Sequence, residues 1–155
     1  MGKTYSWDDL QPKSAEGYTS SDLEEIPKAI GFLRKALGEE FVANGMHARH
    51  PMMFYVVNQA QWTRKWFAQF AKALQSTRHW ANGDSLLERI RDPRKFREAL
   101  SVLRAGVALE GAGFRIEVDP RIDSSKIPDL RIAAPNGDTL LVEVSELGPS
   151  QLETG

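Results

Sequence analysis

Two acidic residues near the end of the chain have the types and the spacing of a metal-binding pair. Asp129 opens one expected strand after Pro128, and Glu143 lies near the end of the next strand. A hairpin turn at residues 135–138 lies midway between them, so antiparallel pairing would bring the two carboxylates opposite each other. Like charges at that distance repel unless a cation lies between them. Mg²⁺ or Mn²⁺ suits such oxygen ligands, and a bound ion can activate water and stabilise a phosphoryl group.

A long helix and three short strands must position these carboxylates. Apolar and polar residues alternate over 114–118, 129–132 and 139–144, as they do in half-buried strands. Before them, apolar residues at helical spacing predict a helix that begins at Pro93 and ends at Gly111. The sequence therefore predicts an α+β fold, in which a helical N-terminal region precedes a helix and a three-stranded antiparallel meander.

The stretch from about residue 94 to residue 146 resembles the core of the PD-(D/E)xK nuclease superfamily, which has the restriction-endonuclease-like fold. The resemblance covers about a third of the chain and rests on the helix ending in Gly111-Ala112-Gly113-Phe114, the strand Arg115 to Val118, Pro128-Asp129 and Glu143-Val144-Ser145. It implies that Asp129 and Glu143 hold Mg²⁺ or Mn²⁺ and that Val144 offers its carbonyl oxygen to the ion. It also implies hydrolysis of phosphodiester bonds in DNA by an active member.

Two departures from the family pattern bear on catalysis and on the fold. The family's lysine, which orients or deprotonates the attacking water, falls on Ser145, so Lys126 in the preceding loop is a candidate substitute. The family often has a further acidic residue on its first helix, for which Glu98 and Glu110 both qualify. Too few residues follow Glu146 for the family's second helix and last strand. The core is therefore expected to be incomplete, or completed by a second copy or a further protein segment.

Charge is distributed unevenly along a chain whose formal net charge is only -1. Between Phe41 and Gly83 there is no Asp or Glu. This favours phosphate binding by the basic residues of an expected helix over 58–75. A second basic cluster just before the nuclease-like helix consists of Arg89, Arg91, Arg94, Lys95 and Arg97. The candidate DNA-binding residues are Arg64, Lys65, Lys72, Arg91, Arg94 and Lys95. The alternative for the second cluster is ordinary helix solvation, with Glu88 and Glu98 as partners.

Aromatic residues in the same region allow two interpretations. Tryptophans with basic neighbours can stack on the bases of single strands. Trp62, Trp66, Phe70 and Leu74 instead follow helical spacing, which favours a place in the core. We therefore expect these side chains to be buried.

The remaining features set the organisation of the chain and its surroundings. We expect a loosely ordered lead-in at 1–20, a helical region at 21–92 and the nuclease-like part at 93–155. The chain has no cysteine, its N-terminus lacks the apolar run of a signal peptide, and its longest apolar run, 51–57, is too short for a membrane span. A cytoplasmic protein with no membrane partner is expected.

Two functions follow from these observations. The leading hypothesis is a metal-dependent nuclease-like hydrolase that acts on DNA, or a catalytically degenerate descendant that only binds DNA. The alternative is a helical protein-interaction module, whose tryptophan-rich helix docks a partner while the meander is structural.

Overall fold

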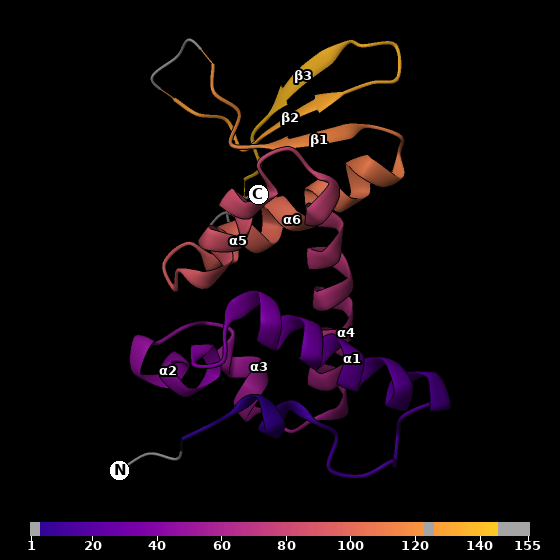
Figure 1. Cartoon of the computed structure of the whole chain (residues 1–155), viewed down its shortest axis with the longest axis vertical. Helices are drawn as coiled ribbons and strands as arrows, with labels where there is room; N and C mark the ends of the chain where they lie inside the picture. The colour runs from indigo at the N-terminus through magenta and orange to yellow at the C-terminus, as the bar shows by residue number, and fades with distance from the viewer. Residues whose placement is uncertain (1–3, 123–125, 146–155) are drawn as a thin grey trace, which may run out of the picture. The chain divides into compact units, whose positions relative to one another are not determined.

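The structure is a computed structural model, and it describes residues 4–122 and 126–145. Helices occupy the first two thirds of the described chain, and three antiparallel strands follow them (Figure 1). This confirms the predicted α+β class. Two compact units share the chain: unit 1 comprises Met1–Gln75 and Arg91–Phe96, and unit 2 comprises Ser76–Ile90 and Arg97–Gly155. Both units are therefore discontinuous, unlike the expected division at residues 92 and 93.

Unit 1 is helical. Its elements are the 3-10 helix η1 (Trp7–Leu10) and the α-helices α1 (Ser20–Leu37), α2 (Phe41–Ala48), α3 (Met53–Val57) and α4 (Gln61–Ser76). Thr19 caps α1 in a reciprocal capping box with Asp22, and Gly38 ends the helix at a φ of 104° that favours glycine. The expected lead-in contains η1, in which Trp7 and Leu10 are fully buried. Part of this segment therefore belongs to the core.

Helix α4 buries a different face from the one expected. Its buried residues are Thr63, Arg64, Phe67, Phe70, Ala71 and Leu74. Phe70 and Leu74 confirm the prediction, but Trp62 is 52% exposed and Trp66 is only half-buried, so their assignment to the core is wrong. The reason is that Arg64, a charged residue, occupies a core position, which rotates the buried stripe away from Trp62.

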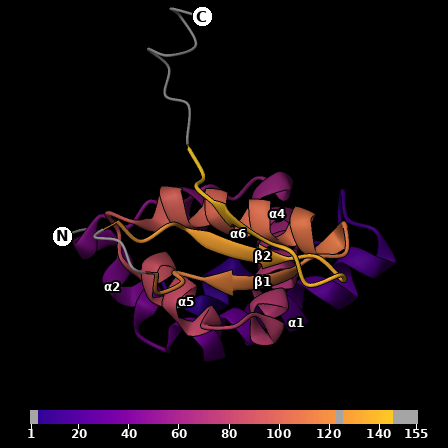
Figure 2. The ribbon, with the colours of Figure 1, turned by 90° about the horizontal axis from the view of Figure 1, so that it is seen from above.

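Unit 2 contains a sheet with helices on one of its sides (Figure 1 and Figure 2). Its elements are η2 (Thr77–His79), α5 (Gly83–Arg91), α6 (Phe96–Gly111), β1 (Arg115–Val118), β2 (Leu130–Ala133) and β3 (Thr139–Val142). The strands lie in the order β1-β2-β3 and pair antiparallel, as predicted. Alternate residues of β1 and β2 are buried, whereas no residue of β3 is. The core of unit 2 therefore lies under the first two strands.

The segment before α5 is tied to the outer edge of β1. Ala81 donates its N–H to the carbonyl of Ile116 at 3.0 Å and accepts from the N–H of Val118 at 2.9 Å. Trp80 packs against α6 at Gly106, where a Cβ atom would come within 2.4 Å of the indole ring. These contacts fix the start of α5 against the sheet and the helix.

The helices of residues 4–122 and 126–145 also bear on the expected lack of a membrane partner. None of the helices there combines the length and the apolar character that crossing a bilayer requires.

Candidate functional site

The hairpin of β2 and β3 brings the two predicted carboxylates to the same end of the sheet. Leu130 pairs with Val142 in the observed register. Continuing this register by one residue along the two strands places Asp129 opposite Glu143. The N–H of Val144 donates to Asp129 Oδ2 at 2.9 Å, which holds the ends of the hairpin together. The pairing that the turn predicted is therefore present, but Val144 engages Asp129 through its N–H.

A guanidinium group joins Asp129 to two further carboxylates, those of Asp119 and Glu98. Arg89, on α5, donates from Nη1 to Asp119 Oδ1 at 3.2 Å and from Nη2 to Asp129 Oδ1 at 3.3 Å. Its Nη2 also donates to Glu98 Oε1, on α6, at 3.2 Å. Only 13% of the Arg89 side chain is exposed. We call Arg89, Asp119, Asp129 and Glu98 the arginine–carboxylate cluster.

Local backbone geometry explains why Asp119 joins this cluster. It directly follows β1 and adopts a left-handed φ of 45°, and its N–H donates to the carbonyl of Asp129 at 3.0 Å. Its Oδ2 accepts a hydrogen bond from the hydroxyl of Ser85, one helical turn before Arg89 on α5. Asn82 fastens the same region because its side-chain amide donates to the carbonyl of Val118 at 3.0 Å. Asp119 is thus held by the carbonyl of Asp129, the residue before β2, and by α5, through Ser85 and Arg89.

Glu143 has a separate cationic partner. Lys126 Nζ lies 3.2 Å from Glu143 Oε2, and the two side chains are 77% and 51% exposed. An ion pair this exposed contributes little to stability because water and salt screen it. Lys126 is therefore close to the predicted site, where it neutralises Glu143.

Arg89 occupies the position next to Asp129 at which an ion was expected. Within residues 4–122 and 126–145, no three His, Asp or Glu side chains are grouped so that they could hold one. Arg89 fills the space between Asp119 and Asp129 with a positive charge and hydrogen-bond donors. The cation that paired carboxylates require is thus supplied by the protein itself.

Three other residues were predicted for this site, namely Ser145, Glu98 and Glu110. Ser145 is exposed just beyond Val144 and carries no charge. Glu98 contributes to the arginine–carboxylate cluster, whereas Glu110 accepts a hydrogen bond from Trp80 Nε1 at 2.8 Å. Of the two acidic candidates on α6, Glu98 is therefore the one near Asp129.

The predicted phosphate-binding residues of α4 are not equivalent. Arg64 is 1% exposed, and burial lowers the pKa of its guanidinium. It donates to the backbone oxygens of Asp9, Tyr55, Val56 and Asn58. The prediction that Arg64 binds nucleic acid is wrong, because its donors are committed inside unit 1. Lys65 is 42% exposed and lies 3.8 Å from Asp22, while Lys72 is exposed.

The second basic cluster lies at the surface of unit 1. Arg91, Arg94 and Lys95 are all exposed, and Arg94 makes a long ion pair of 3.9 Å with Asp92. The Arg94 side chain remains 92% exposed in this pair. We call these three residues the basic cluster.

The sequence named Asp129 and Glu98 but missed Asp119, and it placed Arg89 in the second basic cluster and not beside Asp129. A usable signal existed for Arg89. Leu86 and Ile90 mark the buried face of α5, and Arg89 lies beside Ile90, one turn after Ser85. Asp119 had a weaker signal, its position at the end of a strand before Pro120.

Comparisons of this chain with protein families, with curated proteins and with solved structures find no match.

Proposed function

We propose that this chain is a nuclease-like DNA-binding protein in which Arg89 takes the place of the metal ion. The observation that carries the proposal is the contact of one guanidinium with Asp119, Asp129 and Glu98. Carboxylates that converge in this way need a positive charge. A guanidinium supplies the charge and the hydrogen bonds, but it cannot activate water as a metal does.

The second support for a non-cleaving protein is the residue at the lysine position of the nuclease motif. Ser145 is exposed and uncharged, and Lys126 is engaged with Glu143. A water molecule near Asp129 would therefore lack both a metal ion and a free ammonium group. DNA binding in the absence of cleavage is the expected activity.

The basic cluster is the proposed phosphate-binding surface, and its neutralisation tests the proposal. We expect wild-type protein to bind duplex DNA with strong salt dependence, since each phosphate contact releases counterions. The triple variant Arg91→Gln, Arg94→Gln, Lys95→Gln should reduce the slope of log K against log salt by roughly 2 to 3. Fluorescence anisotropy of a labelled duplex over a salt series measures this slope.

A matched control removes three positive charges elsewhere. Lys13, Lys35 and Arg104 are also exposed, so their replacement by Gln changes the net charge equally. Equal slopes for both triple variants would show that only the overall charge matters and would remove the basic cluster from the proposal.

Metal-assisted DNA cleavage is a second candidate function, favoured by the opposition of Asp129 and Glu143 across the hairpin. It predicts nicking of supercoiled plasmid in Mn²⁺ or Mg²⁺ that EDTA abolishes and that Asp129→Asn reduces at least about 100-fold. Glu110→Gln is the matched control, since Glu110 lies on the same helix as Glu98 but outside the cluster. An absence of nicking by wild-type protein in either ion would eliminate this candidate and favour the first.

A further inference from the structure

The solvent-facing side of α4 carries a row of side chains suited to a polyanion. Trp62, Lys65, Gln69 and Lys72 are spaced by three, four and three residues, which places them along one face of the helix. Helix α4 contains no Asp or Glu. At a rise of about 1.5 Å per residue, the row extends roughly 15 Å from Trp62 to Lys72.

An aromatic cluster lies at the N-terminal end of this row. Phe54 and Trp62 are 59% and 52% exposed, so much of each ring meets solvent. Both rings contact Tyr55, with centroid distances of 5.5 Å and 6.0 Å and nearly perpendicular planes. The centroids of the Phe54 and Trp62 rings are 6.2 Å apart, so the two rings form one contiguous apolar surface.

These exposed rings are held by a stack that reaches the core. Tyr55 lies flat on Trp66, with centroids 3.9 Å apart and planes only 5° from parallel. Trp66 in turn stacks on Phe70 at 5.0 Å, and Phe70 is buried. The stack fixes Tyr55, against which Phe54 and Trp62 pack. The two exposed rings are therefore pre-organised, which reduces the entropy that binding would cost.

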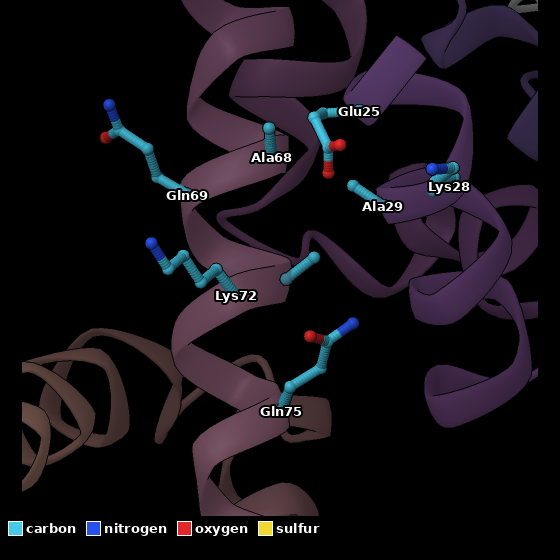
Figure 3. Close-up of a pocket in the computed structure, with 8 residues that line it drawn as sticks. Glu25, Lys28, Ala29, Ala68, Gln69, Lys72 and Gln75 are labelled. Carbon is cyan, nitrogen blue, oxygen red and sulfur yellow. The ribbon is translucent and has the colours of Figure 1, made fainter. Parts of the chain in front are cut away.

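Acidic residues of α1 approach the row without covering it. Asp22 is the ion-pair partner of Lys65 at 3.8 Å. Glu25 and Lys28 line a groove of about 530 Å³ beside α4. Gln69 and Lys72 line the same groove from α4, and their side chains extend away from Glu25 and Lys28 (Figure 3). Lys72 makes no ion pair with any residue in the described part of the chain, so its ammonium is available to an anion.

We propose that this face of unit 1 binds single-stranded DNA, with unpaired bases stacked on Phe54 and Trp62 and phosphates held by Lys65 and Lys72. The inference rests on the proposed DNA-binding function and adds a second surface of unit 1, distinct from the basic cluster, that takes single strands. Base–aromatic stacking needs an exposed base face, which a duplex does not offer along its length. Two lysines disfavour a protein partner, because lysine is depleted at protein interfaces.

Binding of a fluorescein-labelled oligo-dT, measured in EDTA so that no metal-dependent cleavage occurs, tests the inference. We expect Trp62→Ala to weaken binding roughly tenfold and Trp62→Phe to restore most of it, since a phenyl ring also stacks. Lys72→Gln should lower the affinity at low salt and reduce its salt dependence. Unlabelled oligo-dT should compete, whereas a duplex of equal length should compete poorly.

Matched variants separate this site from general effects. Leu140→Ala removes an apolar side chain of unit 2 that is 63% exposed, and Lys35→Gln removes an exposed charge of α1. Both should bind oligo-dT like wild-type protein. Circular dichroism melting checks that each variant folds.

Several outcomes would overturn the inference. It fails if wild-type protein does not bind oligo-dT, if Trp62→Ala binds unchanged, or if duplex competes equally well. Duplex binding lost only in the basic-cluster variant, with no binding of oligo-dT, would leave the proposed function standing while removing this site. Capture of a protein partner that depends on Trp62, without binding of oligo-dT, would favour the interaction-module alternative.

Discussion

Replacement of Arg89 by Ala is expected to destabilise the protein by about 2–3 kcal/mol, which corresponds to a fall in Tm of roughly 5–10 °C. The loss leaves the carboxylates of Asp119 and Asp129 close together without a cation, and their side chains are only 25% and 16% exposed. Removing one partner of a half-buried ion pair costs more than the pair contributes, because the remaining charges stay desolvated. Differential scanning calorimetry measures the change.

Divalent ions should reverse part of this loss in the variant alone. If Arg89 replaces a metal, millimolar Mn²⁺ should raise the Tm of Arg89→Ala by several degrees, since a ligand that binds the folded state stabilises it. Wild-type protein should not respond. The double variant Arg89→Ala, Asp129→Asn should lose the response, because it lacks the carboxylate that would ligate the ion.

Arg97→Ala is the matched control, since Arg97 lies exposed on α6. It should change Tm by no more than about 1–2 °C. A stable Arg89→Ala variant would mean that the arginine–carboxylate cluster is not a structural substitute for a metal ion. An equal response to Mn²⁺ in wild-type protein would have the same meaning.

Replacement of Arg64 by Met should be more damaging still, at about 3–4 kcal/mol and roughly 10 °C in Tm. The Arg64 guanidinium donates hydrogen bonds to the carbonyls of Tyr55 and Val56 in the last turn of α3, and to the carbonyl of Asn58, which follows α3. Carbonyls at the end of a helix have no partner within the helix, and buried groups left unpaired cost the full desolvation penalty. The same side chain reaches Asp9 in η1, so two segments lose their anchor.

Two further variants test whether the hydrogen bonds of the Arg64 guanidinium cause this loss of stability. Arg64→Lys should recover less than half of the loss, because a single ammonium cannot reproduce the planar fork of donors. Lys65→Met, at the adjacent exposed position, should change stability by less than about 1 kcal/mol. Chemical denaturation followed by circular dichroism gives all three values. Full stability of Arg64→Met would show that water can replace the guanidinium at these carbonyls.

The hairpin was predictable because its determinants are local. The turn at residues 135–138 and the alternation on both sides of it fix the register, and the register fixes Asp129 opposite Glu143. The order of α6 and the three strands could be predicted for the same reason. Helical spacing and the change to a period of two mark where α6 ends and β1 begins.

The partner of Asp129 was not predictable by the same reasoning. Arg89 lies 40 residues before Asp129. Their contact depends on how α5 meets the sheet, which no local pattern encodes. The prediction that Trp62 and Trp66 are buried was wrong for a related reason. Arg64 is a charged residue at a buried position, and hydrophobic periodicity assigns it to the surface. Once Arg64 belongs to the core, Trp62 must face solvent.

The interleaving of the two units affects the order in which the chain can fold during synthesis. Unit 1 needs Phe96, which is 1% exposed and packs near Phe70, although it follows α5 of unit 2. A nascent chain that ends at residue 90 therefore contains most of unit 1 but cannot complete its core. A fragment cut at residue 93 would also separate Arg89 from Asp119 and Asp129. The segment that carries Asp119 and Asp129 would then lack the cation that Arg89 provides in the intact chain.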